Sequence, residues 1–322
     1  MRFVADTPAA ALALAPLAPP RSASLDALSP SLQAAWSRLS PQPADPFWLA
    51  ELDYAQGGDA ERTLLVVERA PMSQFVALQE ALRAGDALPN DLTCLALEGE
   101  GFRGQRARTW QALRGNLHLV RLARLDLPVE AVQAALAALP AVASVAALER
   151  ASNGAISVGV KWVNDLMVAE HKVGGVLAAT QVAAGIVSHA LFGIGINLSA
   201  RPTLERDPRV APAGCLSGLC GDAAPTLATL APALSVELDR AVEGLRAGAA
   251  AQLLEAYRRA SASVGRRVAV WPVGDDALPL VPMRSGRVLA IDDDLALVLD
   301  DGSVVHSGRI TFLDGDRDDT RA

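Results

Sequence analysis

Four short apolar runs of strand composition follow one another between residues 156 and 198. They read ISVGVKWV, LMVA, KVGGVLAATQV and SHALFGIGINL, and the connections between them are too short to hold a helix. Strands joined by such short connections pair as antiparallel neighbours. This stretch therefore predicts consecutive hairpins in a sheet near the middle of the chain.

The segments before these hairpins predict further strands and helices. Residues 63–68 and 92–99 have strand composition, and the amphipathic pattern between them ends at Gly85. Residues 115–123 again read as a strand, and 128–149 read as a helix with prolines at its first position and inside it. The order predicts an α+β fold, a mixed β-sheet with flanking helices.

The two ends of the chain differ from this middle part. Helical patterns over 227–245 and 252–264 precede four short strands, which predict a small β-barrel over residues 265–322. Residues 1–45 are rich in Ala, Pro, Ser and Leu, and we expect a low-complexity lead-in without the helices of a DNA-binding winged helix. The main domain is then expected over 46–264.

Composition restricts the classes of function. The net charge of −7 gives no broad basic surface for nucleic acid, so we expect no DNA partner. Prolines, glycines and charges interrupt the apolar stretches, which predicts a cytoplasmic protein without a membrane partner. The three cysteines form no CxxC pair, so neither a disulfide framework nor a protein-bound metal is expected. The oligomeric state stays open, with a homodimer as one possibility.

Lysine occurs at two positions in the whole chain, Lys161 and Lys172, whereas every other basic residue is arginine. An ammonium group is a compact charge that can follow a carboxylate or phosphate, whereas the planar guanidinium fixes one geometry. Two lysines eleven residues apart therefore indicate chemistry that arginine performs badly. The alternative is a pair of ordinary solvated charges at strand ends.

This stretch resembles the signature of the biotin protein ligases, in which KWPND is followed by a turn and KLxGIL. The chain has KWVND and KVGGVL, and FGIGINLS is similar to the GxGIN strand of that family. The positions in register are Lys161, Trp162, Asn164, Asp165, Lys172, Gly175 and Leu177. The resemblance covers about Thr63 to Asp314 and implies a biotin/lipoate ligase-like catalytic module followed by an SH3-like barrel.

The resemblance also implies an activity. Such an enzyme uses ATP and Mg²⁺ to form an acyl-adenylate, by default biotinyl-5′-AMP, and transfers the acyl group to a lysine of a biotin carboxyl carrier domain. Lys172 would bridge the acyl carboxylate and the α-phosphate. Asp165 would hold magnesium-bound phosphate or accept a proton, with Lys161, Trp162 and Asn164 beside the nucleotide. The alternative for Asn164 and Asp165 is a simple turn entry.

The ligand loop departs from the family pattern GRGRxGRxW. Residues 102–110 read FRGQRARTW, so Arg103, Gly104, Arg106, Arg108 and Trp110 remain as candidate nucleotide contacts. The alternatives are a solvated loop for the arginines and core packing for the tryptophan. The biotin-binding Ser-Thr-Asn triplet of the family is expected at residues 69–71, which here are Arg, Ala and Pro.

The glycines of the motif complete the predicted site. Gly174 and Gly175 would let a ligand approach the backbone, and Asn197 would meet the nucleotide at a strand end, with a glycine-lined turn as the alternative. Because the triplet is altered, lipoate or octanoate stay open as acyl groups. A third possibility is a non-catalytic relative that binds nucleotide or the carrier domain.

Overall fold

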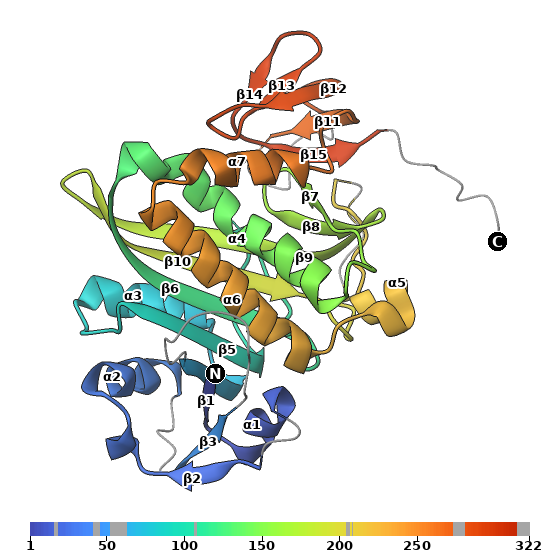
Figure 1. The fold of residues 1–322 in the computed structure, drawn as a ribbon. Coiled ribbons are helices and arrows are strands. Elements are labelled where there is room, and N and C mark those ends of the chain that lie inside the picture. Colours follow the sequence, from blue (N-terminus) through green and yellow to red (C-terminus); the bar gives the residue numbers. More distant parts are fainter. Residues whose placement is uncertain are drawn as a thin grey trace.

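The computed structural model describes residues 1–15, 19–40, 46–51, 63–105, 108–203, 207, 209–272 and 281–313. Within them, ten strands form one mixed sheet in the order β2-β3-β1-β4-β5-β6-β10-β9-β8-β7 (Figure 1). The strands are β1 (Arg2–Ala5), β2 (Arg21–Ala23), β3 (Phe47–Glu51), β4 (Thr63–Ala70), β5 (Asp91–Gly99), β6 (Leu117–Pro128), β7 (Gly159–Lys161), β8 (Asp165–Val168), β9 (His171–Ala183) and β10 (Ile186–Ile196).

Helices cover both faces of this sheet. They are α1 (Pro8–Leu14), α2 (Pro30–Leu39), α3 (Gln74–Ala84), α4 (Val129–Ala151), α5 (Leu216–Cys220), α6 (Leu227–Arg246) and α7 (Ala250–Arg259). Helices α4, α6 and α7 lie together over one face, where they pack on one large apolar cluster (Figure 1). Helices α2 and α3 pack on the other face, which has its own cluster. Neighbouring residues of β4 alternate between the two clusters, as the period of a strand requires.

The central hairpins form as the sequence predicts. Strand β9 pairs antiparallel with β8 and with β10, and β7 pairs antiparallel with β8. Ala184 and Gly185 connect β9 to β10 with φ of 49° and 76°. Positive φ at both residues is the requirement of a tight turn whose twist matches a hairpin. The prediction of a mixed sheet with flanking helices is confirmed.

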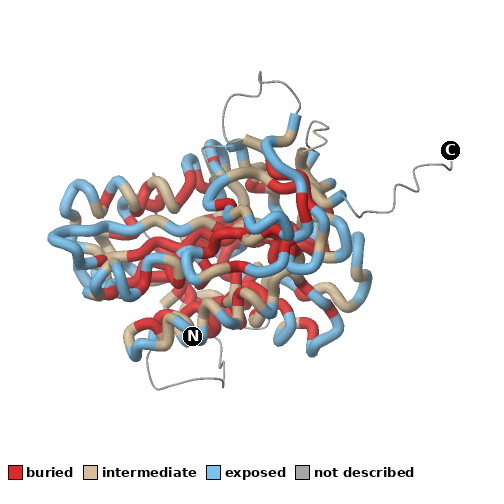
Figure 2. Tube along the Cα trace, turned by 90° about the horizontal axis from the view of Figure 1, so that it is seen from above, coloured by how far each residue is buried: buried red, intermediate tan, exposed pale blue. Residues whose placement is uncertain are grey.

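Helix α4 has the length and the hydropathy of a membrane-spanning helix, with a mean hydropathy of 1.9 over its most apolar window. The helix nevertheless lies in the middle of the fold, where it packs against α6, α7 and β9. Most of its residues are buried, and they include Pro140 in its interior. Figure 2 shows the buried residues as a continuous band through the centre of the molecule. We therefore interpret α4 as the core helix of this sheet.

Five short strands form a second, antiparallel sheet after α7. They are β11 (Arg267–Trp271), β12 (Arg284–Ile291), β13 (Leu297–Leu299), β14 (Val304–Val305) and β15 (Arg309–Phe312), in the order β14-β13-β12-β11-β15. A separate small β unit at this end agrees with the expected SH3-like domain. The exact domain limits, 46–264 and 265–322, stay predictions.

The structure differs from the expected lead-in over residues 1–45. Strand β1 lies inside the large sheet, antiparallel to β3 and parallel to β4. Phe3, Val4 and Ala5 are completely buried in it. Four residues are too few to show a strand period, and the partners of β1 are distant in sequence, so only tertiary pairing reveals this strand. Pro30 does divide the helical patch, because α2 begins there with Ser29 as its N-cap.

We predict that Phe3→Ala destabilises the protein by about 3 to 5 kcal/mol, because it leaves a cavity in the apolar cluster in which Phe3 is completely buried. Leu12→Ala on the neighbouring helix α1 should change stability by less than about 0.5 kcal/mol, because Leu12 is 42% exposed. Urea unfolding of both variants measures the difference. Equal midpoints for the two variants would show that β1 is not part of the core.

Candidate functional site

The lysine stretch forms three neighbouring strands. Lys161 on β7 lies opposite Asp165 on β8, and Asp165 lies opposite Gly175 on β9. The register between β8 and β9 shifts after Leu166, and Lys172 Nζ reaches Asp165 Oδ1 at 2.5 Å. The side chains of this pair are 23% and 21% exposed, so the pair is accessible to a ligand. The motif therefore brings both lysines to one carboxylate.

Positive charge exceeds negative charge around this carboxylate. Burial by itself raises the pKa of Asp165, but Lys172, Lys161 and Arg108 outweigh burial and lower it, so Asp165 is ionised. Lys161 is only 4% exposed, and its pKa is lowered, first by burial and further by Lys172, Arg309 and Arg108, against the opposing effect of Asp165. A cluster with surplus cations has a favourable potential for an anion.

Strand register extends the site across the sheet. His118 on β6 lies opposite Gly195 on β10, which lies opposite Gly175, and the row continues to Asp165 and Lys161. Residues in such a row point to the same face of the sheet. Two of them lack side chains, so the sheet presents its backbone beside the charged cluster.

Aromatic rings cover part of this glycine floor. A Cβ on Gly195 would lie 2.5 Å from the Trp110 ring, and one on Gly193 would lie 2.9 Å from Phe75. At Gly175 the contacts would be ordinary, with Lys172 Nζ at 3.6 Å. Aromatic groups therefore fill the floor over β10, whereas at Gly175, next to the Lys172–Asp165 pair, a Cβ could be accommodated without overlap.

The ligand loop folds back on itself between β5 and β6. Gly104 N–H donates to Arg108 O at 2.7 Å, Arg103 bridges to Thr109, and Trp110 N–H donates to Phe102 O at 3.0 Å. The small turn brings Arg108 within electrostatic reach of Lys161 and Asp165. Arg106 lies outside the described residues.

Trp110 is held by a buried histidine. Its indole N–H donates to His118 Nδ1 at 3.2 Å, and the two rings meet edge to face. Burial lowers the pKa of His118 to about 4, so the ring is neutral and can accept this bond at Nδ1. Trp110 therefore has both a packing partner, Gly195, and a polar partner.

Three of the predicted contact residues have roles within the protein itself, two through their side chains and one through the absence of a side chain. Trp162 Nε1–H donates to Leu295 O of the C-terminal sheet at 2.6 Å. Asn164 Nδ2–H donates to Val176 O at 2.7 Å, which joins the turn to β9, as the turn-entry alternative anticipated. A Cβ on Gly174 would lie 2.7 Å from a backbone oxygen, so this glycine is required by strand packing.

Asn197 combines a structural bond with an unused acceptor. Its Nδ2–H donates to Gly214 O at 2.9 Å, and its backbone N–H donates to Val173 O. The side chain is 2% exposed, yet Oδ1 accepts no hydrogen bond within the described part of the chain. A buried acceptor without a donor is unfavourable, so Oδ1 is a candidate ligand contact.

The start of α3 holds polar residues that the sequence reasoning missed. Arg69, in the expected triplet, pairs with Glu100 at the surface. Ser73 and Gln74 follow four and five residues after Arg69 and are 4% and 1% exposed. Ser73 is the N-cap without a side-chain cap bond, and neither amide atom of Gln74 has a partner among the described residues. A serine directly before an amphipathic helix is the sequence signal that marks this position.

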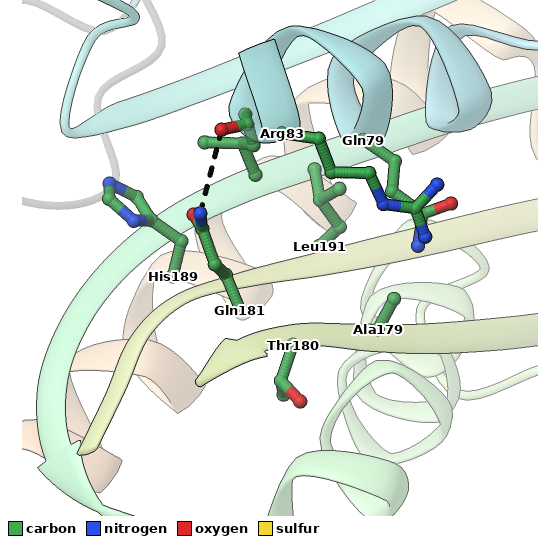
Figure 3. A pocket seen from close by; sticks show the side chains of 8 residues that line it. Gln79, Arg83, Ala179, Thr180, Gln181, His189 and Leu191 are labelled. Carbon is green, nitrogen blue, oxygen red and sulfur yellow. Dashed lines mark hydrogen bonds between the residues drawn. The ribbon is translucent and has the colours of Figure 1, made fainter. Parts of the chain in front are cut away.

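A shallow depression of about 70 Å³ lies at the far end of the same hairpin, between α3 and the strands β9 and β10 (Figure 3). Gln181 Nε2–H donates to Leu82 O across it. Ala179, in its wall, is seven residues along β9 from Lys172, or about 23 Å at the rise of a strand. This depression is therefore separate from the charged cluster.

No group of three or more His, Cys, Asp and Glu side chains suited to a metal ion occurs in the part of the chain that the structure describes. A divalent ion at the charged cluster would therefore depend on ligands from a bound phosphate group, with Asp165 as a carboxylate beside it.

A mixed sheet with a cation-rich cluster on a glycine floor is the arrangement of a catalytic module that binds an anionic substrate. The model of the biotin/lipoate A/B protein ligase family matches residues 73–197. A biotin--[acetyl-CoA-carboxylase] ligase of Mycobacterium tuberculosis is 32% identical over 262 residues, which cover 80% of this chain and 91% of that protein. The chain therefore belongs to the biotin/lipoate A/B protein ligase family, and the resemblance read from KWVND and KVGGVL is confirmed.

Two further comparisons agree. The bifunctional ligase/repressor BirA of Escherichia coli is 30% identical over 125 residues, 38% of this chain and 36% of that protein. The biotin protein ligase of Aquifex aeolicus, solved with biotin and ATP, shares the fold with a TM-score of 0.59 and 18% identity, over 77% of this chain and 97% of that one.

We predict that Gly195→Ala destabilises the protein by about 1 to 3 kcal/mol, because its Cβ overlaps the Trp110 ring. Gly175→Ala should cost less than about 1 kcal/mol, because its contacts are ordinary. Urea unfolding followed by tryptophan fluorescence tests both, and the Gly195 variant should also change the emission of Trp110. Similar effects of the two substitutions would contradict this account of the floor.

Proposed function

We propose that the protein is an ATP-dependent ligase that activates biotin as biotinyl-5′-AMP and transfers the acyl group to a lysine of a biotin carboxyl carrier domain. The observation that carries the proposal is the Lys172–Asp165 pair, which lies beside Lys161, Arg108 and the side-chain-free position Gly175. Both reaction steps concentrate negative charge, and surplus cations in a partly buried site stabilise such states.

In the first step a carboxylate oxygen of the acid attacks the α-phosphorus of ATP, and pyrophosphate leaves. Lys172 is suited to contact the carboxylate and the α-phosphate together, because its ammonium can exchange Asp165 for the substrate anions without moving far. In the second step the acceptor amine attacks the acyl carbon, AMP leaves, and the amine loses a proton. Asp165, kept ionised by its neighbours, can accept that proton.

The nucleotide would lie between the loop and the hairpin. Arg103 and Arg108 would approach its phosphates, and Asn197 Oδ1 would accept a hydrogen bond from it. Arg106 is a further candidate for a phosphate contact because of its position in the sequence of the ligand loop. Mg²⁺ would enter with the triphosphate, and the cytoplasmic location stays a prediction.

The start of α3 supports a polar acyl group. Within the described residues Gln74 has an unpaired amide donor and acceptor, and Ser73 adds a hydroxyl. Both are buried one or two residues from Phe75, which packs on Gly193 of the glycine floor. A urea-like ring edge offers both donors and an acceptor, so it satisfies this set, whereas an octanoate chain would leave these groups unpaired. The altered residues 69–71 are therefore no argument against biotin.

Exchange of labelled pyrophosphate into ATP tests the proposal, with biotin, lipoate or octanoate added singly. Biotin-dependent exchange, followed by biotinylation of a carrier domain, is expected. Exchange that depends on lipoate or octanoate but not on biotin would show that the enzyme activates one of those acids instead. Absence of exchange with all three acids, with ATP still bound, would favour the non-catalytic alternative.

We predict that Lys172→Arg impairs biotin-dependent exchange almost as much as Lys172→Ala, because the planar guanidinium cannot take the position of an ammonium between two anions. The loss should be two or more orders of magnitude, on the order of 3 kcal/mol of transition-state stabilisation. The arginine variant should retain the wild-type fold by circular dichroism. Wild-type turnover in this variant would contradict the role of Lys172.

We predict that Gln74→Leu weakens biotin binding by one to two decades while it stabilises the free protein by about 1 kcal/mol, because leucine removes a buried amide without partners. Gln79→Leu on the same helix is the matched control, and it should leave biotin binding unchanged. Calorimetric titration and thermal unfolding measure the two effects. A destabilised Gln74→Leu variant with full biotin affinity would refute this assignment.

A further inference from the structure

The C-terminal sheet lies directly against the lysine stretch. Trp162 is bonded to Leu295 through its indole, and its backbone N–H donates to Ser263 Oγ at 3.0 Å. Arg266 forms an ion pair at 3.0 Å with Glu170, in the turn that precedes β9. The C-terminal part of the chain thus contacts the turns on both sides of β8, the strand that carries Asp165.

Phe312, in β15, is an aromatic side chain of that sheet that approaches the charged cluster. The ammonium of Lys161 lies 5.7 Å from the centre of its ring, and the guanidinium of Arg266 lies 4.1 Å from it. Both distances are within the range of cation–π attraction. The aromatic ring therefore has one cation of the site and one cation of the second sheet as neighbours.

We propose that Phe312 is a positioning residue of the ligase reaction: its ring holds the buried ammonium of Lys161 beside Asp165, so that docking of the C-terminal sheet completes the anion site. The expected effect of Phe312 on catalysis rests on the proposed function. The contact itself does not depend on that function and can be measured without any substrate.

A ring suits this position better than a carboxylate would. The charged groups around Lys161 are Asp165 on β8, Lys172 on β9, Arg309 on β15 and Arg108 in the ligand loop. A second carboxylate would neutralise the surplus positive charge that an anionic substrate needs. The negative face of an aromatic ring attracts the ammonium and carries no net charge. Phe312 can therefore stabilise Lys161 in its protonated form and leave the cluster cationic.

The two lysines of the chain make the contact directly observable. Lysine labelled with ¹³C at Cε gives one signal for each lysine, and Lys172→Arg identifies the signal of Lys161. The variants are Phe312→Leu and a chain with 3,5-difluorophenylalanine at position 312, which keeps the shape of the ring and weakens its negative face. Phe312→Tyr retains the face, and Ile310→Val, in the core of the same strand, is the control for general loosening of the sheet.

The pKa of Lys161 should fall further in the leucine and difluoro variants, because each removes an attraction that favours the protonated amine. It should be unchanged in Phe312→Tyr and Ile310→Val. In the exchange assay with biotin, the leucine variant should lose about tenfold in kcat/KM for ATP, and the alkaline limb of its pH profile should move to lower pH. The tyrosine variant should be close to wild type.

The proposal would be overturned if the Lys161 signal had the same chemical shift and the same titration in the wild-type and difluoro chains. It would also be overturned if Phe312→Leu caused the same loss of exchange in the wild-type protein and in a Lys161→Met variant. If Phe312→Leu does not fold, the difluoro chain decides the question. A wild-type protein without exchange but with the expected lysine titrations would refute the proposed function and leave the contact standing.

Discussion

The association of Asp165 with Lys172 and Lys161 across three strands is the interaction on which the site depends. One ionised carboxylate draws two ammonium groups together, and burial of Lys161 makes that attraction stronger than it would be in water. The carboxylate offsets part of the repulsion between the cations, and because the cations outnumber it, the cluster still attracts an anion. The short turns between β7, β8 and β9 are what bring the three residues within reach of one another.

The glycine floor lies directly beside this charged cluster. Strand register aligns Gly195 and Gly175 with Asp165, so two positions without side chains lie in the same row as the carboxylate. Trp110 and Phe75 fill the floor over β10, and neutral His118 holds the tryptophan. The altered ligand loop thus still forms a defined wall, even though its glycines differ from the family pattern.

Two regions outside the motifs support the site from opposite sides. The start of α3 contributes two buried polar side chains, Ser73, which makes no side-chain cap bond, and Gln74, whose amide atoms have no partner among the described residues. The C-terminal sheet contacts the lysine stretch through Leu295, Arg266 and Phe312. The proposed recognition of the acyl group and the proposed placement of Lys161 thus depend on residues that lie outside the sequence motifs.

By itself the sequence determined the order of the main strands and helices and pointed to the Lys172–Asp165 pair. Both depend on local information: residue periodicity for the elements, and for the pair a motif whose strands are adjacent in the chain, so that short turns force Lys161, Asp165 and Lys172 together.

Only the tertiary structure decided the remaining features. It inserted β1 between β3 and β4, joined Trp162 to Leu295, buried the side chain of Gln74 and brought Phe312 to Lys161. Each of these joins or encloses residues from segments far apart in sequence. Their burial and contacts depend on the packing of the whole chain, for which a single sequence holds no local signal.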